Sequence, residues 1–125
     1  MFEGEYTVAL DWFFRFELPQ PYIRELRDGE NEPCHFYFLP EAALLLYPDR
    51  AFMALVLGRK QQQNQGKADP ADIIRRLSMG NRVPAFFTKK GTVKLPRALR
   101  RGYRFTRGGR VRLKGRDDHI EISIV

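Results

Sequence analysis

Basic side chains are the feature of this sequence that points most clearly to a chemistry. From Lys89 to Lys114 the chain contains no acidic residue. Arginine and lysine bind phosphate groups, arginine through a planar fork of donors and lysine as a compact point charge. Because arginine outnumbers lysine here, we favour nucleic acid over an acidic protein surface or plain solvent as the partner of this segment. The arginine-rich run comprises Arg97, Arg100, Arg101, Arg104, Arg107, Arg110, Arg112, Lys114 and Arg116.

Charge is distributed unevenly along the chain, whose net charge is +7. Residues 1–48 contain 3 Lys or Arg and 9 Asp or Glu, whereas residues 81–125 contain 13 and 3. A basic segment of this kind attracts polyanions, but the acidic part of an identical subunit is also a suitable partner. The sequence therefore leaves both DNA binding and head-to-tail self-assembly open.

The residues that could support catalysis or metal binding do not form a recognisable set. Cys34 and His35 are adjacent but lack a second pair of ligands, so they do not predict a structural zinc site. Asp117, Asp118 and His119 fit a polar turn before a strand, because no nucleophile accompanies them. The sequence also lacks a glycine-rich phosphate loop and a nucleophile elbow. We therefore expect no enzyme activity, no cofactor, no metal and no small-molecule substrate.

Three features predict a cytoplasmic protein. Cys34 is the only cysteine, which excludes an internal disulfide and favours a reducing compartment. No apolar run approaches the ~20 residues of a membrane span, and the segment Met1–Glu5 has no basic leader region. We expect a cytoplasmic, nucleoid-associated protein without a membrane partner.

An internal repeat is the main indication of the architecture. Residues 10–19 and residues 87–96 each enter as a strand, turn, and leave through alternating apolar positions to end in Leu-Pro. Such alternation places one face of a strand on a core and the other in solvent. The chain is therefore expected to contain one small β-rich unit twice.

Short helices are expected after each Leu-Pro, at residues 22–26 and 98–101. Pro21 and Pro96 suit the first helical turn, where a missing backbone N–H removes no helical hydrogen bond. Gly102 suits the end of the second helix, because glycine adopts the left-handed conformation easily.

Two strands are predicted after each helix, at 35–39 and 44–47 in the first copy and at 111–114 and 120–124 in the second. The first pair is almost continuously apolar and should be buried on both faces, whereas the second pair alternates and should face solvent on one side.

The expected fold is a β-rich α+β domain in which the two copies intertwine. We assign residues 1–48 to the first unit, residues 49–80 to a helical linker and residues 81–125 to the second, strongly basic unit. Within the linker the sequence predicts two helices separated by a polar loop at residues 61–67. The second of these helices is expected at residues 69–80, where Asp-Pro-Ala-Asp provides a helix start.

Short motifs in a consistent order run through nearly the whole chain. They are Met1-Phe2-Glu3-Gly4, the turn from Asp11 to Arg15, Leu18-Pro19, Tyr22-Ile23-Arg24, Leu44-Leu45-Leu46-Tyr47-Pro48, Arg75-Arg76-Leu77, Leu95-Pro96, Leu99-Arg100 and Glu121-Ile122. Together they resemble the MraZ family, bacterial transcriptional regulators built from two tandem AbrB-like swapped-hairpin units. The resemblance implies an intertwined pseudo-two-fold barrel with a central helical pair. It also implies a ring-forming homo-oligomer that binds repeated elements in a promoter of the cell-division and cell-wall gene cluster.

The resemblance further implies that the turn of each copy contacts double-stranded DNA. Arg15 carries over directly as the base-contacting residue, with Asp11 orienting it. In the second turn, Thr88 and Thr92 stand where the family has Asp and Arg, so lysines would have to replace the lost arginine. Lysine lacks the fork that reads guanine, so this copy should add affinity more than sequence choice. The predicted DNA contacts are Arg15, Lys89, Lys90, Lys94, Arg97, Arg100 and Arg101.

The first turn could also have a role that does not involve base contacts. Asp11 and Arg15 can form a purely structural ion pair across the turn. The family's turn usually contains Lys-Gly-Arg, whereas this chain has three aromatic residues, Trp12, Phe13 and Phe14, before the arginine. These aromatics can form a stacking platform for single-stranded nucleic acid, but we favour a subunit interface.

The function predicted from the sequence is that of a sequence-specific DNA-binding transcriptional regulator, acting as an oligomer on repeated promoter elements. The alternative is an oligomeric assembly or adaptor protein that kept the fold and lost specific DNA reading. An AbrB-like antitoxin is a weaker third possibility, because such antitoxins usually carry one unit.

Overall fold

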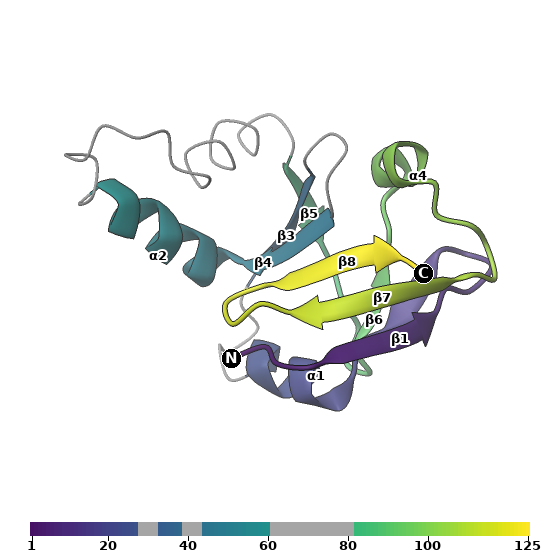
Figure 1. Ribbon diagram of the computed structural model, residues 1–125, viewed down its shortest axis with the longest axis horizontal. Helices are drawn as coiled ribbons and strands as arrows, with labels where there is room; N and C mark the ends of the chain where they lie inside the picture. Colours follow the sequence, from purple (N-terminus) through teal and green to yellow (C-terminus); the bar gives the residue numbers. More distant parts are fainter. Residues whose placement is uncertain (28–32, 39–43, 61–81) are drawn as a thin grey trace.

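The computed structural model describes residues 1–27, 33–38, 44–60 and 82–125 of the chain. It has a β-rich α+β fold with an antiparallel six-stranded sheet, in the order β1-β7-β8-β4-β3-β5, and an antiparallel two-stranded ribbon of β2 and β6 (Figure 1). The strands are β1 (Glu5–Ala9), β2 (Arg15–Glu17), β3 (Cys34–Phe38), β4 (Leu44–Pro48), β5 (Arg82–Ala85), β6 (Thr92–Lys94), β7 (Arg110–Gly115) and β8 (Ile120–Ile124). The helices are α1 (Gln20–Arg27), α2 (Asp49–Lys60) and α4 (Arg97–Tyr103). The predicted β-rich α+β class is confirmed.

Strand pairing in the sheet exchanges segments between the two halves of the chain. The first strand, β1, pairs with β7, and β5 pairs with β3, while β4 and β8 pair in the middle. The registers correspond: Tyr6 lies opposite Leu113 in one pairing, as Val83 lies opposite Phe36 in the other. Neither half therefore completes its part of the sheet without the other.

Burial along the strands follows the pattern expected from the sequence. In β7, Val111 and Leu113 are fully buried while Arg112 and Lys114 between and after them are exposed. In contrast, β4 is buried along its whole length. The predicted contrast between an alternating strand and a strand covered on both faces is confirmed for this pair.

A second, smaller core explains why β4 is covered on both faces. The first turns of α2 place Phe52 against the sheet, where its ring stacks on Tyr37 with a centroid separation of 4.2 Å. Tyr47 meets both rings edge-on, at 5.6 Å from each. Leu45 completes this cluster. In Figure 1 α2 extends from the side of the sheet that β3 and β4 form.

The two short helices follow the Leu-Pro motifs as expected, but their ends differ from the prediction. Pro21 lies in the first turn of α1, whereas Pro96 is the N-cap of α4, with an extended backbone (φ −60°, ψ 150°). Gly102 does not end α4, which continues to Tyr103 and closes at Arg104 in the left-handed conformation. Arg104 adopts this conformation where the chain turns to bury Phe105 in the core. The capping position is therefore set by tertiary packing, not by the glycine.

The central region is described in part. The first helix expected there is present as α2. The polar loop predicted at 61–67 and the helix predicted at 69–80 lie outside the described residues, as does Arg75-Arg76-Leu77. Of the helices that the structure describes, none combines the length and apolar character needed to cross a membrane.

Two buried tyrosines are expected to make the stability of the fold depend on pH. Tyr22 is fully buried, and its hydroxyl donates a 2.8 Å hydrogen bond to the Gly4 carbonyl. Tyr37 lies at the centre of the second core. Burial raises the pKa of Tyr22 to about 12 and the pKa of Tyr37 to about 12, from an ordinary value of 10.0.

We expect the free energy of unfolding to decrease between pH 10 and 12 because of these two groups. In that interval the unfolded chain has lost the phenolic protons that the folded protein keeps, so raising the pH favours unfolding. Urea unfolding over this range should give a shallower pH dependence for a Tyr22→Phe, Tyr37→Phe variant than for the unmodified protein. Parallel profiles of unfolding free energy against pH for the two proteins would contradict the assignment of this pH dependence to Tyr22 and Tyr37.

Candidate nucleic-acid interface

The β2–β6 ribbon brings the two repeated turns into one surface region. The first turn, Asp11–Arg15, leads from β1 into β2, and the second, Thr88–Thr92, leads from β5 into β6. Antiparallel pairing places Arg15 directly opposite Lys94. Residues from the two halves of the chain thus become neighbours.

Asp11 holds the first turn and Arg15 together. Its Oδ1 accepts hydrogen bonds from the backbone N–H groups of Phe13 and Arg15, both at 2.8 Å. Its Oδ2 lies 3.0 Å from Arg15 Nε in an ion pair. The hydrogen bond from the Arg15 backbone N–H is the main cause that lowers the pKa of Asp11, because it favours the charged carboxylate. The Asp11–Arg15 contact is the structural ion pair considered as an alternative, and the role of Asp11 in orienting Arg15 toward DNA stays a prediction.

The second turn repeats this backbone arrangement with different side chains. The Asp11 N–H donates to the Arg15 carbonyl at 2.8 Å, and the Thr88 N–H donates to the Thr92 carbonyl at 3.0 Å. The Thr88 hydroxyl accepts a hydrogen bond from the Thr92 N–H at 3.2 Å. A neutral hydroxyl thus takes the place that the Asp11 carboxylate has in the hydrogen bond from the Arg15 N–H. At the tip of this turn, Lys89 and Lys90 occupy the positions that Trp12 and Phe13 occupy in the first.

Each turn is also anchored to the opposite half of the chain. The Leu18 N–H donates to the Gly91 carbonyl, and the Leu95 N–H donates to the Phe14 carbonyl, both at 2.9 Å. Phe14 and Gly91 are the equivalent positions of the two turns and both have positive φ, 59° and 82°. The left-handed conformation is thus required at this position in both copies, although only one copy has the glycine that adopts it without strain.

Four of the predicted DNA contacts line one shallow groove of about 580 Å³. We call it the basic groove; its charged residues are Arg15, Lys89, Lys90 and Lys94. All four are exposed, and the other lining residues are Phe86, Phe87, Thr88 and Thr92. No acidic side chain is among these described lining residues. A groove of this composition favours a polyanion.

The remaining predicted contacts lie on α4. Arg97 is exposed at its first position. Arg100 is half-buried, and its guanidinium lies 4.2 Å from the centre of the Phe14 ring while its Nε donates to the Leu95 carbonyl at 3.0 Å. It therefore supports the first turn and is not one of the groove residues. The side chain of Arg101 lies outside the described part of the structure.

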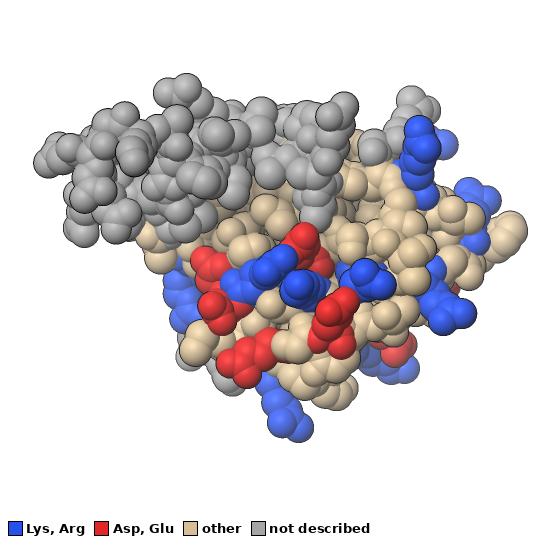
Figure 2. All heavy atoms as spheres, in the orientation of Figure 1, with Lys and Arg blue, Asp and Glu red and all other residues tan. Residues whose placement is uncertain are grey.

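Other members of the arginine-rich run are engaged on the outer face of the sheet. Arg112 pairs with Glu5 at 3.0 Å, and Arg116 pairs with Glu121 at 2.7 Å. Figure 2 shows basic and acidic side chains interspersed over the face that β1, β7 and β8 present. The run is thus divided between surfaces, and this face carries both signs of charge.

The two histidines, which were considered from the sequence as catalytic or metal-binding residues, have structural partners. His119 stacks on Tyr47 with a centroid separation of 4.3 Å and lies 2.6 Å from Asp118. His35 Nδ1 lies 2.5 Å from Asp49 at the start of α2. Within the described residues, no group of three or more His, Cys, Asp or Glu side chains is arranged to hold a metal ion.

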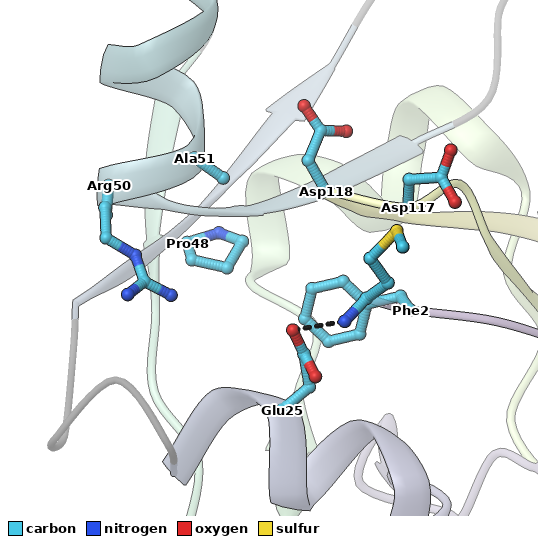
Figure 3. Close-up of a pocket in the computed structure, with 8 residues that line it drawn as sticks. Phe2, Glu25, Pro48, Arg50, Ala51, Asp117 and Asp118 are labelled. Carbon is cyan, nitrogen blue, oxygen red and sulfur yellow. Dashed lines mark ion pairs between the residues drawn. The ribbon is translucent and has the colours of Figure 1, made fainter.

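A smaller pocket of about 280 Å³ lies apart from the basic groove (Figure 3). Glu25 comes from α1, Arg50 from α2, and Asp117 and Asp118 from the turn between β7 and β8. Phe2 lies among them, and the pocket therefore mixes apolar surface with side chains of both charges. This composition differs from that of the basic groove, whose charged lining residues are all basic.

Two features of the site were missed in the sequence: the contacts of Arg107 with the aromatic rings of the first turn, and the exposure of Phe86 beside the basic groove. Arg107 lies 5.6 Å from the Trp12 ring and 5.3 Å from the Phe14 ring, although it follows them by a long stretch of chain. Phe86, before the second turn, is 80% exposed beside the basic groove. The alternation of β5 could have indicated the exposure of Phe86, but no local pattern indicates the contacts of Arg107.

A comparison with models of known protein families gives no match for this sequence, and a search of curated proteins gives none either.

Proposed function

We propose that this protein is a DNA-binding transcriptional regulator of the MraZ type, acting as a homo-oligomer on repeated promoter elements. The observation that carries the proposal is the basic groove, in which cations from both turns converge on the β2–β6 ribbon. Phosphate contacts fix the position of a protein on DNA, and base contacts provide the choice of sequence.

Within this proposal, the lysines of the second turn bind phosphates and Arg15 reads a base. Lysine acts as a point charge, whereas the arginine fork can donate two hydrogen bonds to the O6 and N7 acceptors of guanine. Asp11 pairs with Nε of Arg15 and so restricts the orientation in which the guanidinium is presented. Prior ordering of Arg15 reduces the entropy that is lost when it binds.

The strand pairing supports the AbrB-like part of the proposal. Exchange of β1 and β5 between the two halves is the pairing expected of a swapped-hairpin barrel with pseudo-two-fold symmetry. The reciprocal hydrogen bonds of Leu18 and Leu95 to the opposite turns obey the same symmetry. The two turns are then the equivalent DNA-contacting positions of two tandem units.

Oligomerisation would let several basic grooves meet successive DNA repeats. When one subunit of an oligomer binds, it raises the effective concentration of the other subunits near the DNA, so a modest affinity in each subunit is enough for tight binding of the whole. A cytoplasmic, nucleoid-associated location follows from this proposal.

A second candidate is an assembly or adaptor protein that kept the fold and lost specific DNA reading. The observation that favours it is the exposure of aromatic side chains, since Trp12 is 65%, Phe13 62% and Phe86 80% exposed. The second turn also has Thr88 and Thr92 in place of the expected acid and arginine, which is in accord with a loss of specific DNA reading.

The test is a fluorescence-anisotropy titration against the DNA upstream of the protein's own gene and against a scrambled duplex, at about 50 and about 200 mM salt. Arg15→Ala and Arg15→Lys should both lower the preference for the upstream DNA by about tenfold, because each removes a bidentate base contact. Arg15→Lys keeps the charge and should leave binding to the scrambled duplex nearly unchanged. Equal binding to both duplexes would indicate a general polyanion binder, and no binding at physiological salt would favour the assembly protein.

A further inference from the structure

The first turn presents an exposed pair of aromatic rings flanked by arginines. Trp12 is 65% exposed and Phe13 is 62% exposed. Arg15 lies 5.1 Å from the centre of the Phe13 ring, and Arg107 lies 5.6 Å from the centre of the Trp12 ring. We call these four residues the aromatic tip.

The backbone below the aromatic tip is fixed by several interactions. The Phe13 N–H donates to Asp11, and the carbonyl of Phe14 accepts from Leu95. Arg100 covers the Phe14 ring at 4.2 Å. The two exposed rings are therefore carried on a turn whose backbone is held in place. Exposed apolar surface of this kind usually marks a contact site.

The charges beside the rings restrict the chemistry of the partner. A ligand that covers both rings also meets the guanidinium groups of Arg107 and of Arg15, which is already paired with Asp11, so a ligand that combines a flat apolar face with negative charge fits best. A second aromatic tip would supply the flat faces but would bring arginines against arginines. An acidic peptide would supply the charge, but only aromatic residues within it would supply the flat face. An unpaired nucleotide carries both features in a single unit.

We propose that the aromatic tip is a stacking site for unpaired nucleobases, so that the protein holds single-stranded or locally opened nucleic acid at its first turn. This inference rests on the proposed nucleic-acid function and adds to it a division of roles between the turns. Trp12 and Phe13 stack on bases, while Lys89 and Lys90, at the equivalent positions of the second turn, bind phosphates. The two turns thus bind different parts of the same polymer.

Trp12 is the only tryptophan of the chain and reports directly on the site. The probe is an oligothymidylate of about 12 nucleotides, within the range that small single-strand-binding domains cover. Its matched control is an abasic strand of the same length, which keeps the phosphates and lacks the bases. Oligothymidylate should quench the Trp12 emission, and the abasic strand should leave it nearly unchanged.

Variants measured by anisotropy of labelled oligothymidylate complete the test. Trp12→Ala and Phe13→Ala should each weaken binding by about tenfold, the usual effect of losing one stacked base. Met53→Ala removes an apolar side chain of similar exposure, 53%, from α2, and should leave binding unchanged. Circular dichroism of each variant should match that of the unmodified protein.

The possible results separate this inference from the proposed function. Salt-dependent duplex binding, with equal affinity for oligothymidylate and the abasic strand and no quenching, would overturn the stacking site and leave the regulator proposal intact. Base-dependent quenching without duplex binding would support the stacking site and overturn the regulator proposal. A smaller sedimenting species for Trp12→Ala, with no binding of either strand, would overturn the stacking site in favour of a subunit interface.

Discussion

Replacing Lys89 and Lys90 together by alanine is expected to weaken binding to duplex DNA by about tenfold or more at physiological salt. Both side chains lie in the basic groove at the tip of the second turn. Removing two phosphate contacts should also reduce the slope of log affinity against log salt by about 2. Anisotropy titrations at several salt concentrations give both quantities. The preference for one sequence over another should change little, because these lysines contact phosphates.

The matched control for this variant is Arg112→Ala, Arg116→Ala. It removes the same charge from the chain, but from the outer face of the sheet, where the two arginines pair with Glu5 and Glu121. We expect its affinity for DNA to stay within about twofold of the unmodified protein, because removing distant exposed charges has only a screened effect. If both double variants lose affinity equally, net charge rather than the groove determines binding.

Gly91→Ala is expected to destabilise the fold by about 3 kcal/mol, combining an unfavourable backbone conformation with an overpacked site. Gly91 has a φ of 82°, and a Cβ at this position would lie 2.3 Å from Cδ1 and 2.7 Å from Cγ1 of Ile23. Ile23 is itself only 2% exposed, so its side chain has little room to move away. Urea unfolding followed by circular dichroism measures the change in free energy.

Gly108→Ala separates the two causes. Gly108 also has a positive φ, 73°, but a Cβ there would meet nothing within 4 Å. Its substitution should cost about 1 kcal/mol, the part that is due to backbone conformation alone. Equal losses at the two glycines would show that the contact with Ile23 does not matter.

Gly91→Ala should also weaken DNA binding. The carbonyl of Gly91 accepts the hydrogen bond from Leu18, so a displaced turn would shift Lys89 and Lys90 relative to Arg15. Gly108→Ala, which lies outside both turns, should leave the affinity unchanged among the molecules that remain folded.

The sequence predicted those parts of the fold that depend on local pattern. The alternation of Val111 and Leu113 with basic residues predicted a strand with one solvent face, and the apolar run at 44–47 predicted a strand covered on both faces. The two Leu-Pro motifs predicted the helices that follow them. Each of these signals reflects where neighbouring side chains point, and such information is contained in a few consecutive residues.

The details that the sequence did not predict depend on contacts between distant segments. The contact of the Arg100 guanidinium with the Phe14 ring joins the two halves of the chain, so no local pattern indicates it, and the DNA contact of Arg100 stays a prediction. The end of α4 at Arg104 follows from the burial of Phe105 and not from the nearby glycine. The positive φ of Phe14 was hidden because an aromatic residue occupies a position where glycine is usual.

The sequence indicated residues that the structure brings together in the basic groove, but it did not indicate the groove itself, and the DNA-binding role of these residues stays a prediction. The repeat placed Arg15 and the second turn at equivalent positions, and the β2–β6 pairing brings Arg15 opposite Lys94. Charge counting alone could not divide the arginine-rich run between surfaces. That division depends on which acidic residue lies across the sheet from each arginine, as Glu5 does for Arg112.

The most direct test of the basic groove as a DNA-binding surface is amide chemical-shift mapping of the isotope-labelled protein during titration with duplex DNA. We expect the largest shifts at residues 11–15 and 88–94, and little change at residues 110–116 on the outer face of the sheet. Shifts concentrated at 110–116, with the two turns unaffected, would contradict this expectation.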